Sequence, residues 1–267
     1  MKRVARTAAT ITLAGGLVLS LLPAAGASAV PAVTTSAATA ASSSASVEER
    51  RTYQPRKRFA REMVREGAAD TSTSNVEHVR ELQYRLTWAG TYNGPITGRF
   101  ESRLTGAVKR FQKRHKLRIT GTANAATWEK LIPRTVRGRG AVPRACKLRN
   151  GWRVCYDRSR HQVTLWNKGK LWNSWLVRGG SASTATRVGR FEVYYRNKDH
   201  VSSLFGSPMP YSQFFSGGQA FHGSGLMMDP FVGHSHGCVN MYIEDARQLW
   251  LLTAHRGLKV RVYGAWS

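Results

Sequence analysis

Acidic residues are scarce in this chain of 267 residues: 15 Asp and Glu stand against 41 Lys and Arg, which gives a formal net charge of +26. The excess is spread along the chain, since residues 71–133 carry +7 and residues 134–267 carry +14. It is therefore not the property of a basic tail, and it favours polyanionic partners. The same shortage of carboxylates disfavours a zinc-dependent hydrolase that needs a catalytic acid.

A long hydrophobic run is also missing. The apolar run near the N-terminus covers about residues 8–22, which is shorter than the ~20 residues that a membrane-spanning helix needs. Three basic residues precede it, and a small-x-small pattern follows at residues 27–29. Residues 1–29 therefore predict a signal peptide and a secreted protein, with an uncleaved anchor as the alternative. Membrane contact is expected only through this peptide before cleavage. Outside the cytoplasm the positive charge meets anionic cell-wall polymers, so nucleic acid is not an expected partner.

Cysteine is rare, with three in the chain, an odd number for an exported protein. Cys146 and Cys155 flank Asn150-Gly151, a dipeptide typical of a two-residue hairpin turn. We therefore expect a disulfide between the two strands of this hairpin, with two unpaired buried thiols as the alternative. In either case Cys238 has no obvious partner and is a candidate reactive thiol.

Composition and periodicity divide the rest of the chain into three parts. Residues 30–73 are first rich in Ala, Ser and Thr and then in charges of mixed sign, so we expect a linker with a short helix at about 56–66. Residues 74–133 show apolar residues at helical spacing between turn-rich stretches and predict a small all-α module. Residues 141–267 predict a β-rich domain with one helix that begins near Glu244.

Alternating apolar residues predict the strands of this β-rich domain. The alternation is visible at residues 163–165, 191–195 and 258–262, and residues 167–170 are typical of a hairpin turn. Such strands favour two packed sheets. A long segment rich in Gly, Ser, Met and aromatic residues precedes Cys238, and long loops on a rigid scaffold are where sites are usually built.

Cys238 lies in the run SHGCVN at residues 235–240. A thiol attacks as its thiolate, so it needs a base within reach. His236 is the nearer candidate, because residues i and i+2 of an extended segment point to one side. His222 lies 16 residues upstream and would approach from a neighbouring strand. Gly237 permits close backbone approach, and amides around it would form an oxyanion hole.

Two other interpretations of this cluster stay open on the residues alone. In the first, Cys238 is a small buried apolar residue without a chemical role, and the protein only binds the wall. In the second, His234, His236 and Cys238, which alternate, bind zinc together with His222, as in a zinc-dependent wall peptidase.

The cluster resembles the signature of the L,D-transpeptidase catalytic domain (YkuD type). In that family a histidine is followed, at about this distance, by Ser/Thr-His-Gly-Cys, a hydrophobic residue and Asn or Arg, which here are His222 and residues 235–240. Residues 178–181 and 186–191 look like the early strands of the family. The resemblance covers about residues 145–265.

This resemblance implies a β-sandwich in which Cys238 is the nucleophile and His222 is the proton donor and acceptor. The backbone carbonyl of Gly223 would orient His222, and His236 becomes a supporting group, which reverses the order suggested by proximity. Several members of the family have serine at the position of Gly223, but a main-chain role survives that change. The expected substrate-binding residues are Tyr211, Ser235, Gly237 and Asn240, with a core or lid-packing tyrosine as the alternative for Tyr211. Neither a cofactor nor a metal is expected.

Residues 74–133 resemble a three-helix peptidoglycan-binding module, on stretches such as 79–83, 94–100 and 108–112, with an inert spacer as the alternative. The predicted architecture is multidomain: a small three-helix all-α module followed by an all-β sandwich-type L,D-transpeptidase catalytic domain. The expected activity, in a monomer, is 3→3 crosslinking of peptidoglycan stem peptides. A Cys thioester would form on a tetrapeptide stem with release of D-Ala. An L,D-carboxypeptidase with the same Cys/His pair is the alternative. The resemblance also implies that carbapenems acylate Cys238.

Overall fold

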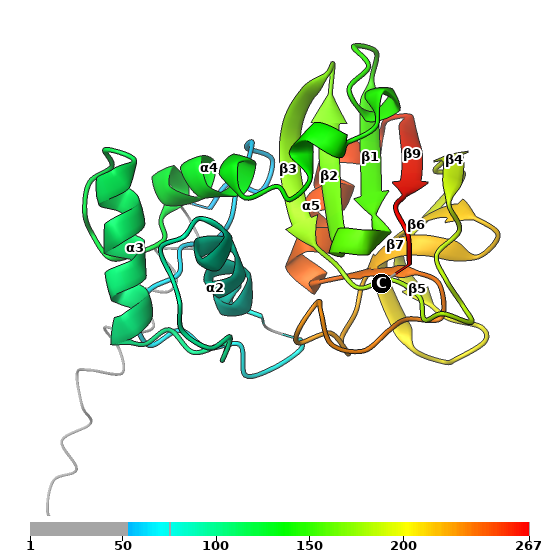
Figure 1. Cartoon of the computed structure of the whole chain (residues 1–267). Coiled ribbons are helices and arrows are strands. Elements are labelled where there is room, and N and C mark those ends of the chain that lie inside the picture. Colours follow the sequence, from blue (N-terminus) through cyan, green and yellow to red (C-terminus); the bar gives the residue numbers. More distant parts are fainter. Residues whose placement is uncertain (1–52, 75, 267) are drawn as a thin grey trace, which may run out of the picture. The chain divides into compact units, whose positions relative to one another are not determined.

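A computed structural model describes residues 53–74 and 76–266 of the chain (Figure 1). The expected signal peptide, residues 1–29, and residues 30–52 of the expected linker lie outside the described residues. None of the helices formed by residues 53–74 and 76–266 has the length and apolar character that a membrane crossing requires.

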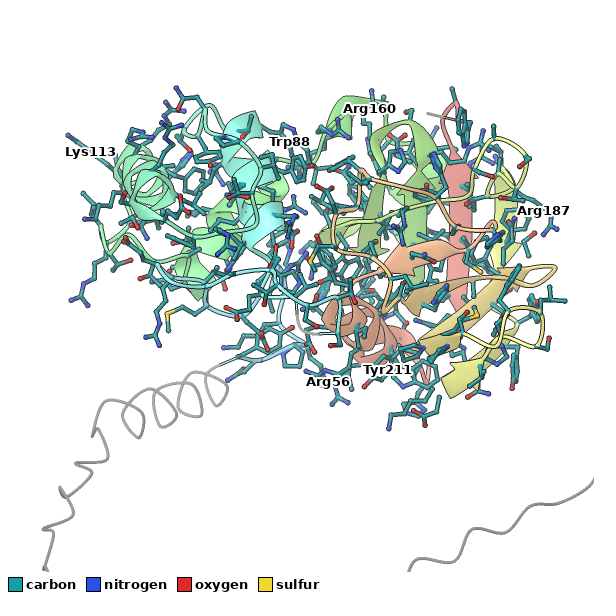
Figure 2. All side chains as sticks on the ribbon, turned by 90° about the horizontal axis from the view of Figure 1, so that it is seen from below. Arg56, Trp88, Lys113, Arg160, Arg187 and Tyr211 are labelled. Carbon is teal, nitrogen blue, oxygen red and sulfur yellow. A yellow bond between two sulfur atoms is a disulfide. The ribbon has the colours of Figure 1, made fainter. Side chains whose placement is uncertain are left out.

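Three helices form the all-α module that the sequence predicts. They are α2 (Val79–Trp88), α3 (Ser102–Arg114) and α4 (Ala125–Arg134). Each turns an apolar stripe inward, so that Leu82, Leu104 and Trp128 are almost completely buried. Charged side chains such as Lys113 point outward from the module (Figure 2). The prediction of three helices is confirmed.

The segment before α2 differs from the expected linker. Residues 53–73 have no helix at 56–66; they form turns and isolated bridges such as the pair Val64 and Ala123. Arg61 is only 3% exposed, because it pairs with the buried carboxylate of Glu81, whereas most other charged residues of this segment are exposed. Mixed charges without periodicity suggested a solvated stretch, and sequence alone gives no sign that a distant carboxylate will bury one of them.

The β-rich domain contains two sheets, of strand order β3-β2-β1-β9-β4 and β5-β6-β7-β8. The strands are β1 (Trp152–Asp157), β2 (Gln162–Asn167), β3 (Lys170–Leu176), β4 (Gly189–Glu192), β5 (Tyr195–Val201), β6 (Pro208–Ser216), β7 (Gln219–Gly223), β8 (Val239–Met241) and β9 (Leu258–Tyr263). Helix α5 (Ile243–Thr253) contacts β6, β7 and β8. The pairs β1–β9 and β7–β8 are parallel, and the other pairs are antiparallel.

One apolar core lies between the two sheets and α5. Val154 and Trp175 come from the five-stranded sheet, Phe221 and Met241 from the four-stranded sheet, and Leu249 from α5; all five are buried. Two sheets that share a core make a sandwich. The predicted fold class is therefore confirmed.

Two strand predictions had different outcomes. The hairpin turn between β2 and β3 is confirmed, since Lys168 (φ 48°) and Gly169 (φ 76°) both adopt the left-handed conformation that a two-residue hairpin turn requires. The alternation at 191–195 is not one strand. β4 ends at Glu192 in one sheet, and β5 begins at Tyr195 in the other. A period of two persists when the chain crosses between sheets, so the sequence does not reveal the crossing.

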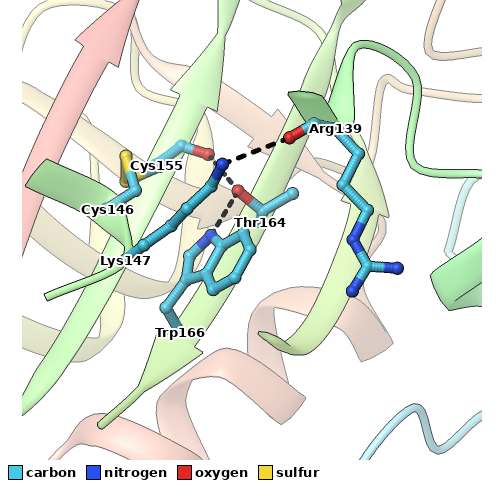
Figure 3. The surroundings of a disulfide bond; sticks show 6 residues. All are labelled: Arg139, Cys146, Lys147, Cys155, Thr164 and Trp166. Carbon is cyan, nitrogen blue, oxygen red and sulfur yellow. Dashed lines mark hydrogen bonds between the residues drawn. A yellow bond between two sulfur atoms is a disulfide. The ribbon is translucent and has the colours of Figure 1, made fainter. Parts of the chain in front are cut away.

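Cys146 and Cys155 are joined in a disulfide, with their Cα atoms 6.1 Å apart (Figure 3). The predicted hairpin around it is wrong. Cys155 lies in β1, but Cys146 ends a 3₁₀ helix, η2 (Arg144–Cys146). Pro143 directly precedes η2, with φ −53°, and it has no N–H to donate to a strand ladder. The bond therefore links a 3₁₀ turn to β1.

The described residues fall within one compact unit, and the module shares buried contacts with the β-rich domain. Trp166 and Leu171, near the turn between β2 and β3, belong to the same apolar cluster as Leu82 and Trp128 of the module. The three-helix module is therefore packed against the sandwich through a continuous core.

Candidate functional site

His222 and Cys238 come together because β7 and β8 are parallel neighbours. His222 is the penultimate residue of β7 and pairs in register with Asn240 of β8, while Cys238 directly precedes β8. Both residues line one pocket of about 840 Å³. The structure thus brings together two side chains that are 16 residues apart in the sequence.

This pocket is basic. Among its described lining residues there is no Asp or Glu, and six side chains carry or can take a positive charge. They are Arg178, Arg187, His200, His222, His234 and His236. A site of this composition attracts substrates that bear carboxylates.

The environment of His222 makes it a neutral base. Its side chain is buried, and Nδ1 lies 2.8 Å from the carbonyl oxygen of Gly223. Because a carbonyl only accepts hydrogen bonds, Nδ1 carries the hydrogen and Nε2 keeps its lone pair. Burial lowers the pKa of His222 to about 4. The Gly223 carbonyl and the Asn240 side chain oppose this effect, while the positive charge of His200 adds to it.

Cys238 is held as a thiol rather than as a thiolate. Burial raises the pKa of the Cys238 thiol, and a hydrogen bond from the backbone of Ala220 opposes this only in part. The Sγ–H group donates to the carbonyl of Gly218 at 3.7 Å. In the described residues it makes no direct hydrogen bond to His222. Attack by this sulfur therefore requires that its proton is transferred to a base in the same step.

Ser235 and Gly237 shape the turn that presents the thiol. Ser235 Oγ donates to the carbonyl of Cys238 at 2.5 Å and accepts the N–H of Gly237 at 3.1 Å. Gly237 has φ 115°, and a Cβ there would lie 2.6 Å from Gln219 Nε2. The hydroxyl of Ser235 is already engaged within the protein, and Gly237 is not among the lining residues. Both residues were expected to bind substrate. Ser235 lines the pocket and remains a candidate contact, while Gly237 supports the turn that carries Cys238.

His234 and His236 point to different neighbours. The exposed ring of His236 stacks on Phe205, with ring centroids 4.3 Å apart, and His234 lies beside Trp266 at 5.7 Å. A support role for His236 therefore runs through Phe205 of the loop between β5 and β6, on the rim of the pocket.

The ligands named in the alternative zinc interpretation do not converge. Among the described residues, the set of three potential ligands within reach of one ion is His78, Glu81 and Asp245, outside this pocket. The guanidinium of Arg61 already stands there, 2.8 Å from Glu81 and 3.6 Å from Asp245. The geometry therefore does not support the zinc interpretation of the motif around Cys238.

Tyr211 is not brought to the pocket. Its φ of 60° interrupts the extended backbone of β6. Its ring packs against the core and lies 6.2 Å from Trp250. The preceding residues Met209 and Pro210 line the pocket in its place. Substrate contact was expected from Tyr211, but a core-packing role fits its position.

Three lining residues were not expected as site residues from the sequence: Arg178, Arg187 and His200. His200 comes from β5, and Arg187 lies on the loop before β4. A single basic residue does not indicate a site in a domain, residues 141–267, that has 17 Lys and Arg. Only the order of strands in the second sheet, with β5 and β6 beside β7, brings His200 close to His222.

Comparison with known families agrees with this geometry. Residues 151–262 match the L,D-transpeptidase catalytic domain (YkuD), and residues 75–131 match the peptidoglycan binding domain. A curated protein, the OxPP cycle protein OpcA of Nostoc punctiforme, is 44% identical over 59 residues. This match covers 22% of the chain and only 13% of the length of that relative.

Solved structures of similar proteins include two L,D-transpeptidases. The enzyme from Stackebrandtia nassauensis is 25% identical with a TM-score of 0.48, and the match covers 73% of this chain and 98% of that one. The enzyme from Xylanimonas cellulosilytica is 24% identical with a TM-score of 0.42, over 74% and 96% of the two chains. On the family matches, residues 151–262 are a catalytic domain of the cysteine-dependent, peptidoglycan-modifying L,D-transpeptidases, and a peptidoglycan-binding domain precedes it in the chain.

Proposed function

We propose that the protein is an exported L,D-transpeptidase that makes 3→3 crosslinks in peptidoglycan, with Cys238 as nucleophile and His222 as acid and base. The observation that carries this proposal is that both residues line one pocket, with His222 on β7 and Cys238 directly before the adjacent parallel strand β8. The hydrogen bond from His222 Nδ1 to Gly223 supports it, because it leaves Nε2 free to accept a proton.

In the first step, Cys238 Sγ attacks the carbonyl of the third residue, a diamino acid, in a donor tetrapeptide stem. The thiol proton passes to His222 Nε2 as the C–S bond forms. The peptide bond to D-Ala then breaks, and His222 returns the proton to the leaving amine. The products are a thioester on Cys238 and free D-Ala.

In the second step, the side-chain amine of an acceptor stem attacks the thioester. His222 accepts a proton from this amine, the C–S bond breaks, and the proton returns to Cys238. Gly237 N–H already donates to Ser235 Oγ, so we assign the amide of Cys238 itself as the oxyanion donor. Transfer of the acyl group to water in place of the amine would make the enzyme an L,D-carboxypeptidase.

The experiment is incubation of the mature protein with a purified tetrapeptide stem, followed by mass spectrometry. We expect free D-Ala and a crosslinked dimer, and we expect neither from Cys238→Ala, which retains wall binding. Full activity in Cys238→Ala would overturn the assignment. If the products are tripeptide and D-Ala without a dimer, the enzyme trims stem peptides as an L,D-carboxypeptidase and does not crosslink them. Loss of activity with a chelator, but not with a thiol alkylator, would favour a metallopeptidase.

Export is proposed from the basic and apolar pattern of residues 1–29. The two family matches support this proposal, because both domains are of types that act on or bind peptidoglycan. Cleavage after Ala29 predicts a mature chain that begins at Val30, and mass spectrometry of protein from the culture medium or wall fraction tests it. A chain that keeps its N-terminus would indicate an anchor instead.

Anionic wall polymers are proposed as a second partner, through the exposed face of α3 and the residues after it. Basic residues are exposed here, residues 102–118 contain no Asp or Glu, and Glu101 directly precedes α3. The exposed basic residues are Arg103, Lys109, Arg110, Lys113, Arg114, Lys116 and Arg118. Binding through such a surface weakens steeply with salt. Retention on walls stripped of phosphate polymers should therefore be lower and less salt-dependent than retention on intact walls.

A further inference from the structure

The loop of residues 224–234 joins the two halves of the proposed catalytic pair. It leaves β7 two residues after His222 and ends just before the turn that carries Cys238. Ser224, Gly225, Leu226 and His234 of this loop line the pocket. A shift of this loop would therefore move both the wall of the pocket and the spacing of the pair.

The sandwich holds this loop from one side. The guanidinium of Arg178 donates to the carbonyls of Leu226 and Val232, both at 3.0 Å, and so bridges the two arms of the loop. The hydroxyl of Tyr242 donates to the carbonyl of Met228 at 3.1 Å. These bonds fix the backbone of the loop but leave the side chains at its centre to other partners.

Helix α2 of the peptidoglycan-binding module holds the centre of the loop from the other side. The hydroxyl of Tyr84 donates to both carboxylate oxygens of Asp229, at 2.9 and 3.1 Å. The ring of Phe231 packs edge-on against Tyr84, with centroids 4.6 Å apart, and against Trp88 at 6.1 Å. Asp229 also accepts the backbone N–H of Phe231 at 2.9 Å, which ties the two contact residues to each other.

Helix α2 is itself fixed to the sandwich by buried charges. Glu81 accepts from Arg61 at 2.8 Å and from Arg85 at 2.7 Å, and all three side chains are almost fully buried. Both guanidinium groups also donate to the carbonyl of Ser174 in β3, at 2.8 and 2.9 Å. Tyr84 directly precedes Arg85 in α2. The buried ion pairs of Arg85 and Glu81 therefore also fix the position of Tyr84, which contacts the loop.

We propose that Tyr84 and Trp88 are positioning residues for the active site, which act through Asp229 and Phe231 on the loop between His222 and Cys238. The module is then more than an anchor to the cell wall, because it holds the centre of a loop whose two ends line the pocket. The effect on activity rests on the proposed function, while the contact itself does not. Loss of one charge-assisted hydrogen bond loosens the loop without emptying the core.

The test compares variants of the full mature chain that differ by one polar group. Tyr84→Phe removes the hydroxyl that holds Asp229 and keeps the ring on Phe231. Asp229→Asn is the conservative variant, because its amide oxygen still accepts from Tyr84 and from the N–H of Phe231. Tyr92→Phe is the matched control. It removes a hydroxyl from the same module, where Tyr92 donates to the carbonyl of Pro95 and not to the loop.

Three readouts separate positioning from a general loss of stability: the rate of carbapenem acylation at Cys238, amide hydrogen exchange of residues 224–234, and Tm. We expect Tyr84→Phe to slow acylation about tenfold and to speed exchange in the loop about tenfold. Retention on purified walls should not change. Asp229→Asn should retain most of the acylation rate, and Tyr92→Phe should match the wild type in acylation and in loop exchange.

The proposal is overturned if Tyr84→Phe is acylated at the wild-type rate, or if Tyr92→Phe loses as much as Tyr84→Phe. If the wild type is not acylated and releases no D-Ala, the proposed function fails. In that case the amide hydrogen exchange of residues 224–234 alone tests whether Tyr84 holds the loop. Faster exchange in Tyr84→Phe but not in Tyr92→Phe supports the contact, and equal exchange in both overturns it.

Discussion

Two buried histidines of this protein have opposite electrostatic surroundings. Nε2 of His78, at the start of α2, lies 3.1 Å from a carboxylate oxygen of Asp245 in α5. Burial alone would lower the pKa of His78, but the Asp245 carboxylate outweighs it and raises this pKa to about 9. His222 has no acid among the described lining residues of its pocket, and burial lowers its pKa to about 4.

The difference shows that the neighbouring charge, not the depth of burial, decides what a buried histidine does. At neutral pH His78 is a cation held between α2 and α5, and it belongs to the structure. His222 is neutral and is available as a base. The shortage of acids in the chain thus has a chemical consequence, because a single carboxylate near His222 would keep it protonated.

The largest effect is expected from removal of the neutral base. His222→Gln should slow acylation of Cys238 by a carbapenem about 10³-fold, because no other group in the proposed mechanism accepts the thiol proton. His236→Gln is the control. Its ring is exposed and stacks on Phe205, so we expect less than a tenfold loss. The rate of adduct formation by mass spectrometry measures both. Equal losses in the two variants would return the base role to His236.

The next largest effect is expected at the buried ion cluster. Asp245→Asn leaves His78 and Arg61 without one of their carboxylates and should lower the free energy of unfolding by about 3 kcal/mol. Glu244→Gln, one residue away on α5, changes a partly exposed pair with Arg247 and should cost less than about 1 kcal/mol. Denaturant unfolding of both variants measures the difference. A similar loss of unfolding free energy in both variants would show that burial does not make the Asp245 pairs stronger than the partly exposed Glu244 pair.

Sequence reasoning reached the fold where a local signal exists. Helical spacing found α2, α3 and α4, and the turn residues at Lys168-Gly169 found the β2–β3 hairpin. Sequence reasoning failed where a residue or strand packs against a part of the chain that is distant in the sequence. Neither the burial of Arg61 nor the passage of the chain from β4 to β5 leaves a periodic trace, because each depends on how the module and the sheets pack.

The residues of the site also divide into those that the sequence indicates and those that depend on distant packing. The motif around Cys238 and the histidine at residue 222 could be proposed from their residue types and from family resemblance, and the parallel pairing of β7 and β8 explains why they meet. The expected pocket contact of Tyr211 depended on its side-chain direction, which a sequence does not give, and in the structure its ring packs against the core beside Trp250. His200 and Arg187 enter the pocket only through the folding of other strands and loops.

A smaller effect is expected from the titration of His78. Its folded pKa of about 9 lies above the unfolded value of about 6.5. The contribution to stability is therefore complete below pH 6.5 and is lost as the pH rises through 9. His78→Gln lacks this contribution, so the difference in stability between wild type and variant should shrink by about 2 kcal/mol between pH 7 and pH 9. Calorimetry at several pH values measures it, and a constant difference would contradict the charged state of His78.

The last substitution tests the comparison of the two histidines most directly, because it gives His222 a carboxylate neighbour like the one that His78 has. Asn240 pairs in register with His222, and Asn240→Asp places a carboxylate beside the ring. The pKa of His222 should rise, and since only the neutral ring accepts the thiol proton, the fall of the acylation rate at acid pH should begin at higher pH. If the pKa of His222 rises by about one, the acylation rate at any pH below the old value should fall about tenfold. Asn240→Leu, without charge, should change the height of the pH profile but leave its acid limb near 4. If the limb of Asn240→Asp also stays there, the neighbouring charge does not set the state of His222, and burial alone must account for it.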